Sequence, residues 1–164
     1  MKIGILGGSF DPAHKGHLAI SKEAKKRFKL EKIIWAITKK NPLKAESKTP
    51  ISKKIKYCKK IIGLNSFIKV KFYENIIKSN KTIDLINYLK KNKNIEIFFL
   101  MGADNLINFH KWHKSELISQ KCNIIVFDRH GYKKNSLKSK TFKKLNNKTL
   151  TFVEFKKVNI SSCL

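Results

Sequence analysis

The sequence is poor in cysteine and in long apolar runs, and each shortage excludes a class of protein. Its three cysteines, Cys58, Cys122 and Cys163, lie far apart and form no C-x-x-C pair. This pattern is typical of buried or incidental thiols in a reducing compartment, not of a disulfide framework or a zinc site. No apolar run approaches the roughly 18 residues that span a bilayer. The apolar start ends at Gly7-Gly8, too early for a secretory signal. We therefore expect a cytoplasmic protein with no membrane partner.

Acidic residues are also scarce, because 11 Asp and Glu stand against 37 Lys and Arg, giving a formal net charge of +26. Arg27 and Arg129 are the only arginines, and the lysines run from Lys2 to Lys157 without forming one block. Such an excess can mark a polyanion-binding protein, whereas its even spread favours a solvated basic surface. Both interpretations stay open, although we expect no specific nucleic-acid partner. Either way, the charge helps to attract anionic nucleotides.

Apolar runs alternate with amphipathic stretches along the whole chain, whose 164 residues suit a single domain. The runs predict strands at residues 2–6, 33–37, 68–73, 95–101, 124–127 and 150–155. Helical periodicity predicts helices at residues 17–28, 52–62, 83–91 (capped by Thr82), 105–109 and 115–119. Strands that alternate with helices predict an α/β protein with a doubly wound parallel sheet. Residues 95–101 are nearly all apolar, which indicates a central strand covered on both faces.

In such a sheet, ligands bind beyond the carboxyl ends of the strands. The first strand ends in the string GGSFDPAHKGH, which runs from Gly7 to His17 and leads into a helix. Two glycines let the backbone approach a phosphate closely, and the helix directs its positive end into the same space. His14 and His17 can both face that space and donate to phosphate oxygens. A metal pair or packing histidines are the alternatives, but no acidic or thiol ligand has suitable spacing, so no protein metal site is expected.

This string resembles the signature of the H-x-G-H nucleotidyltransferase superfamily, and its GGSFDP beginning is similar to that of bacterial nicotinate-nucleotide adenylyltransferases. Pantetheine-phosphate adenylyltransferases and cytidylyltransferases carry related strings. Six later segments resemble segments of the nicotinate-nucleotide adenylyltransferases, in the same order along the chain. They are Asn41-Pro42-Leu43-Lys44, Lys81-Thr82-Ile83-Asp84, Met101-Gly102-Ala103-Asp104, Trp112, Arg129-His130-Gly131-Tyr132 and Ile160-Ser161-Ser162. The resemblance implies a Rossmann-like nucleotidyltransferase fold, formed as one domain over residues 1–164.

The resemblance also assigns expected roles to individual residues. It implies that three side chains act on the phosphates during catalysis, namely His14, His17 and Lys44. It implies that substrate is bound by Gly7, Gly8, Ser9, Phe10, Gly16, Thr82, Gly102, Asp104, Trp112, Arg129, Ser161 and Ser162. In this assignment Thr82 and Trp112 hold the pyridine ring, and Gly102 and Asp104 lie beside the adenosine. Ser161 and Ser162 hold the ATP phosphates. Structural alternatives stay open: a capped turn at Gly102–Asp104, a core aromatic at 112, a structural arginine at 129 and a solvated lysine at 44.

The implied reaction transfers AMP from ATP to nicotinate mononucleotide, giving deamido-NAD and pyrophosphate, with Mg²⁺ held mainly by the ATP phosphates. Two alternatives are a sister enzyme with another phosphate acceptor, such as phosphopantetheine, and a catalytically impaired remnant that binds polyanions. The sequence departs from the family pattern at Lys81, where tyrosine is usual, and at Cys163, where threonine is usual. It ends at Leu164, before an expected Ile-Arg and closing helix, so we expect the C-terminal end of the domain to be incomplete. The oligomeric state is left open.

Overall fold

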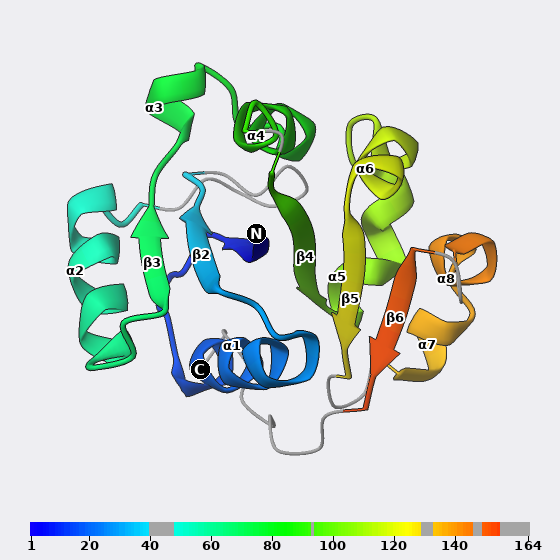
Figure 1. Ribbon diagram of the computed structural model, residues 1–164, viewed down its shortest axis with the longest axis horizontal. Coiled ribbons are helices and arrows are strands. Elements are labelled where there is room, and N and C mark those ends of the chain that lie inside the picture. Colours follow the sequence, from blue (N-terminus) through cyan, green and yellow to red (C-terminus); the bar gives the residue numbers. More distant parts are fainter. Residues whose placement is uncertain (40–47, 93, 129–132, 146–148, 155–164) are drawn as a thin grey trace.

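The computed structural model describes residues 1–39, 48–92, 94–128, 133–145 and 149–154. Within these residues, six strands form one sheet in the order β3-β2-β1-β4-β5-β6 (Figure 1). Every neighbouring pair is parallel. The strands are β1 (Lys2–Gly8), β2 (Lys32–Ile37), β3 (Ile68–Lys71), β4 (Glu96–Gly102), β5 (Asn123–Phe127) and β6 (Leu150–Val153). The α/β class and the parallel sheet predicted from the alternation of patterns are confirmed.

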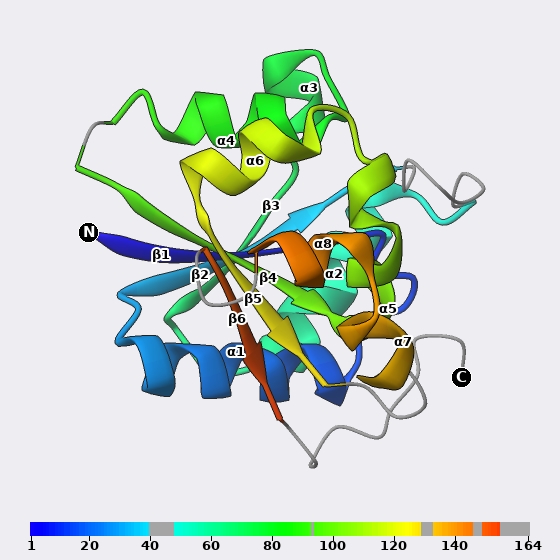
Figure 2. The ribbon, with the colours of Figure 1, turned by 90° about the vertical axis from the view of Figure 1, so that its right-hand side faces the viewer.

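Helices cover both faces of this sheet. They are α1 (Lys15–Phe28), α2 (Ile51–Ile62), α3 (Glu74–Ile77), α4 (Thr82–Leu89), α5 (Ala103–Asn108), the 3-10 turn η1 (Phe109–Lys111), α6 (Ser115–Lys121), α7 (Lys133–Leu137) and α8 (Lys140–Leu145). Figure 2 shows the sheet edge-on, with α1 and α2 on one side and α4 and α6 on the other. This three-layer arrangement buries the apolar strands between helices, as the uniform apolar runs required.

The predicted element ends differ from the observed ends where a cap was misjudged. Helix α1 begins at Lys15, two residues earlier than predicted, because His14 supplies the N-cap. The expectation that Thr82 caps α4 is wrong, since Lys81 is the N-cap residue and Thr82 is already helical. Strand β3 stops at Lys71, not at residue 73, because Tyr73 has helical dihedral angles and is the N-cap of the short helix α3.

Strand β4 is the centre of the core. It lies between β1 and β5, and five of its seven residues are buried. Ile97, Phe99 and Met101 pack with α4, α5 and α6, whereas Phe98 and Leu100 face the side of α1 and α2. The prediction of a central strand covered on both faces is confirmed. The chain adds β2 and β3 on one side of β1, then β4, β5 and β6 on the other. Such a reversal opens a crevice at the carboxyl ends of β1 and β4.

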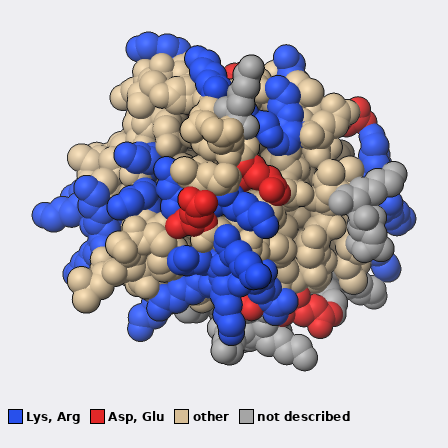
Figure 3. All heavy atoms as spheres, in the orientation of Figure 1, with Lys and Arg blue, Asp and Glu red and all other residues tan. Residues whose placement is uncertain are grey.

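The basic surface is spread out, as the lysine distribution suggested. Figure 3 shows lysine and arginine side chains over much of the face seen in Figure 1, most densely over α1 and α2. Among the described residues, no helix has the length and apolarity that a membrane span needs. The pattern on this face is that of a solvated basic surface.

Two of the three cysteines are buried between the helices and the sheet, and burial raises the pKa of the Cys58 and Cys122 thiols to about 12. Because the thiolate is the nucleophile, we expect neither thiol to react with a disulfide reagent in the folded protein at about pH 8. The measurement is a thiol titration of the Cys163→Ser variant, without and with denaturant. Both thiols should react only after unfolding; rapid labelling of the native protein would contradict this burial.

Candidate active site

His14 and His17 hold each other in place at the beginning of α1. As the N-cap, His14 has an extended backbone, and its Nδ1 accepts a hydrogen bond of 3.0 Å from the backbone N–H of Gly16. In return, Nδ1 of His17 accepts a hydrogen bond of 3.0 Å from the backbone N–H of His14. This reciprocal arrangement is a capping box in which imidazoles replace the usual hydroxyl and carboxylate. Since both Nδ1 atoms act as acceptors, the neutral rings carry their protons on Nε2.

An aromatic cluster packs against the two histidines. The His17 ring lies 4.0 Å from the His14 ring and 4.7 Å from the Phe10 ring, measured between centroids. Phe10 in turn stacks on Trp35 of β2 at 5.2 Å. The Trp35 indole N–H donates to Ser21 Oγ, which donates to the carbonyl of His17, both at 2.8 Å. Phe10 as a whole is only 3% exposed, so its ring belongs to the core beneath the histidines, and its predicted contact with the nucleotide stays a prediction.

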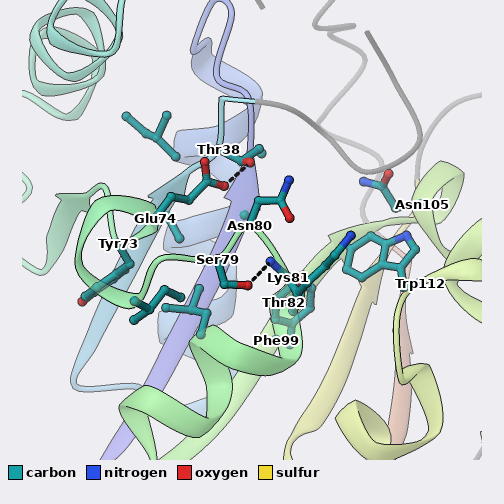
Figure 4. A pocket seen from close by; sticks show the side chains of 16 residues that line it. Thr38, Tyr73, Glu74, Ser79, Asn80, Lys81, Thr82, Phe99, Asn105 and Trp112 are labelled. Carbon is teal, nitrogen blue, oxygen red and sulfur yellow. Dashed lines mark hydrogen bonds between the residues drawn. The ribbon is translucent and has the colours of Figure 1, made fainter. Parts of the chain in front are cut away.

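A cavity opens beside the carboxyl ends of β1 and β2 (Figure 4). It has about 670 Å³ of empty space, including the part open to solvent. Of the predicted site residues, Gly7, Gly8, Thr82 and Trp112 line it. The structure adds Thr38, Tyr73, Glu74, Ser79, Asn80, Lys81 and Asn105, for which no role had been expected. The sequence held a signal for two of them: Thr38 directly follows a predicted strand, and Lys81 departs from the family pattern.

Trp112 forms one wall of the cavity. Its ring is half-buried and meets the Phe109 and Phe99 rings edge-on, at centroid distances of 5.2 and 5.9 Å. Edge-to-face packing is a favoured aromatic geometry, and two such contacts fix the plane of the indole. The ring packs against the core cluster but is only half-buried, so part of it faces the cavity. It offers a fixed apolar surface on which a planar ligand can stack.

The N-terminus of α4 forms the wall beside Trp112, and a short relay of hydrogen bonds sets its position. The Ser79 hydroxyl donates to the Asp84 carboxylate at 2.6 Å and accepts from the backbone N–H of Lys81 at 3.0 Å. This fixes the loop that leads into Thr82, the first helical residue. Backbone N–H groups in the first turn of a helix lack internal partners and favour negative charge nearby. This wall can therefore receive an anionic group.

A buried lysine joins the loops on the other side of the cavity. Lys54 of α2 is 2% exposed, and its ammonium donates to the carbonyl of Thr38 at 3.4 Å. Burial lowers its pKa, although the negative charges of Asp11 and Glu74 act in the opposite direction. Glu74 also accepts hydrogen bonds from the Thr38 hydroxyl and from the backbone N–H of Lys39. The lysine thus ties the end of β2 to α2 and to the acidic side chains around it.

Other predicted site residues lie at the same edge of the sheet or outside the described residues. Gly102 ends β4 and is the N-cap of α5, and Asp104 is in the first turn of that helix. Because β4 neighbours β1, this turn shares an edge with the histidine loop. Gly16 is buried in the first turn of α1. Lys44, Arg129, Ser161 and Ser162 lie outside the described residues, so their predicted roles stay predictions.

Comparisons with known proteins agree with this geometry. The cytidylyltransferase-like family model matches residues 5–164. A protein of Pelagibacter ubique (strain HTCC1062), named "Probable nicotinate-nucleotide adenylyltransferase", is 67% identical over 161 residues, covering 98% of this chain and 89% of the relative. A protein of the same name from Bradyrhizobium sp. (strain ORS 278) is 36% identical over 130 residues, covering 79% of this chain and 68% of its own.

A solved structure shows the same fold at low sequence identity. It is the Plasmodium falciparum nicotinic acid mononucleotide adenylyltransferase complexed with NaAD, with a TM-score of 0.79 and 22% identity. The match covers 99% of this chain and 80% of that one. The expected Rossmann-like nucleotidyltransferase fold is confirmed. From the family model and the close relative together, the chain belongs to the cytidylyltransferase-like family and, within it, to the nicotinate-nucleotide adenylyltransferases.

Proposed function

We propose that this enzyme transfers AMP from ATP to nicotinate mononucleotide, producing deamido-NAD and pyrophosphate for NAD biosynthesis. The observation that carries the proposal is the cavity, which runs from Gly7-Gly8 at the end of β1 to the indole face of Trp112. A phosphate suits the glycine end, where the backbone can approach it closely, and a planar base suits the tryptophan end. The 67% identical relative carries the name of this activity, and a structural neighbour was solved with NaAD bound.

In the reaction, a phosphate oxygen of nicotinate mononucleotide attacks the α-phosphorus of ATP. A new P–O bond forms, the bond to the bridging oxygen breaks, and pyrophosphate leaves with the electron pair. Neither step requires a covalent enzyme intermediate, so the protein contributes positioning and stabilisation of negative charge. The Nε2–H groups of His14 and His17 donate to the α- and β-phosphate oxygens. Because their Nδ1 atoms are held by the backbone, the donors are oriented before ATP arrives.

The remaining roles follow the family resemblance and belong to the same proposal. Lys44 neutralises phosphate charge, Ser161 and Ser162 hold the β- and γ-phosphates, Gly102 and Asp104 lie beside the adenosine, and Arg129 contributes to the substrate site. Mg²⁺ accompanies ATP, and the described residues contain no group of three metal-ligating side chains that would form a protein cage for it. Phosphate oxygens and water would hold the ion, which suits the ligand preferences of Mg²⁺. We place the reaction in the cytoplasm, where ATP is available and thiols stay reduced.

Pyrophosphate release measures the proposed function directly. The purified chain is mixed with ATP and, separately, with nicotinate mononucleotide, nicotinamide mononucleotide and phosphopantetheine. We expect the fastest release with nicotinate mononucleotide and formation of deamido-NAD. Preference for phosphopantetheine would identify a sister enzyme, and no release with any acceptor would leave a binding protein without activity.

The histidines are tested by asparagine variants, because an asparagine side-chain oxygen can replace Nδ1 as the capping acceptor but provides no donor at the position of Nε2. We expect His14→Asn and His17→Asn each to lower kcat by roughly 10²–10³-fold, the usual cost of losing a preorganised donor, with a nearly unchanged melting temperature. His110→Asn, at an exposed histidine on η1, is the matched control and should retain full activity. Turnover near the wild-type rate in either test variant would contradict the phosphate-contact role.

Trp112 is tested by comparing a variant that keeps an aromatic ring with one that does not. Loss of base stacking is worth about 1–3 kcal/mol, so Trp112→Ala should raise KM for nicotinate mononucleotide about tenfold or more. KM for ATP should change little, and Trp112→Phe should recover most of the affinity. Steady-state kinetics with each substrate varied in turn, together with thermal melts, make the measurement. Equal effects on both substrates, or a large fall in melting temperature, would show that the ring is structural.

A further inference from the structure

Few of the described residues that line the cavity are charged, although the protein as a whole is strongly basic. Among the described residues that line the cavity, Glu74 is the only acid and Lys81 is the only base. Glu74 is engaged by the Thr38 hydroxyl and by the backbone N–H of Lys39. The Lys81 backbone is fixed by Ser79, whereas its ammonium forms no ion pair among the described residues. Within the described part of the cavity wall, one cation is therefore available to a ligand.

The position of Lys81 relates this cation to one end of the ligand. Lys81 is the N-cap of α4, next to Thr82, and in Figure 4 its side chain extends toward Trp112. The phosphate of a mononucleotide has to lie at the opposite end, where the glycines of β1 and the histidines of α1 meet the reacting ATP. The ammonium thus lies near the base and away from the reacting phosphate. At the base, nicotinate carries a carboxylate with a full negative charge, whereas nicotinamide carries a neutral carboxamide.

We propose that Lys81 determines specificity by binding the nicotinate carboxylate, so that the enzyme selects the acid over the amide. This inference rests on the proposed function, since it requires the pyridine ring to lie against Trp112. The ammonium supplies a charge-assisted hydrogen bond, and the first-turn N–H groups of α4 add positive potential on the same side. Asp84 is in that first turn, but its carboxylate accepts the Ser79 hydroxyl and stabilises the loop. The carboxamide gains much less from the same groups because it has no net charge.

The test compares Lys81→Met, which keeps the aliphatic length without the charge, with Lys81→Arg, which keeps the charge. With ATP saturating, kcat/KM is measured for nicotinate mononucleotide and for nicotinamide mononucleotide. For Lys81→Met we expect kcat/KM to fall about fivefold with the acid, in line with one charge-assisted contact made by an exposed side chain. It should be unchanged or raised with the amide. Lys81→Arg should keep most of the preference. Lys78→Met, at an exposed lysine that does not line the cavity, is the matched control and should behave as wild type.

Equilibrium binding gives a second measurement that does not depend on turnover. Quenching of tryptophan fluorescence reports each mononucleotide at the Trp112 face, because Trp35 is fully buried. Lys81→Met should lose affinity for the acid only, and the loss should shrink as salt concentration rises. Equal losses for acid and amide, or an unchanged preference, would overturn the role of Lys81. Failure of the wild-type enzyme to adenylylate either mononucleotide, while still binding the acid through Lys81, would instead overturn the proposed function.

Discussion

The site depends on the reciprocal hydrogen bonds between the two motif histidines and the first turn of α1. The helix needs acceptors for its unpaired N–H groups, and the imidazoles need to be held in one orientation and one tautomer. Both needs are met at once, because His14 and His17 each use Nδ1 to accept a backbone N–H, and this orients Nε2 for the phosphate contact that we propose. Phe10 and Trp35 then fill the space beneath the rings. Thus the interaction that begins the helix also preorganises the donors, which is the condition for electrostatic catalysis without reorganisation.

A second constraint is the buried ammonium of Lys54, which lies where the ends of several elements meet. Removing a charge from water is costly unless it is compensated, and here the carbonyl of Thr38 and the carboxylates of Asp11 and Glu74 compensate it in part, since burial still lowers the pKa of Lys54. Asp11 belongs to the motif loop and also accepts a hydrogen bond from the Thr49 hydroxyl. Lys54 therefore links α2 electrostatically to the motif loop. This link helps to hold the motif loop in position against the layer that α1 and α2 form.

The sequence was sufficient for the fold because buried parallel strands leave uniform apolar runs, of which β4 is the clearest. It was less reliable where a side chain sets a boundary: histidine is an unusual N-cap, so the start of α1 was placed two residues late. The motif residues at the end of β1 could be found from the sequence alone. Trp35 and Lys54 could not, since one lies in an apolar strand and the other resembles the many surface lysines. Their importance comes from tertiary neighbours, as does that of Glu74, which meets Thr38 across 36 positions of chain.

Overall charge and local charge have different consequences in this molecule. Exposed lysines spread over the surface raise the concentration of any anion nearby, but interactions beyond about 8 Å are largely screened at physiological ionic strength. A net charge of +26 therefore attracts ATP, mononucleotides and pyrophosphate according to their charge and not according to their shape. Discrimination requires groups held near the ligand in a partly enclosed space. Besides its polar side chains, the described cavity wall offers two backbone glycines, one oriented indole and one lysine, whose backbone is fixed by Ser79 and whose ammonium forms no ion pair among the described residues. The glycines and the indole treat nicotinate and nicotinamide alike, so in our proposal the choice between acid and amide falls to Lys81 at the N-terminus of α4.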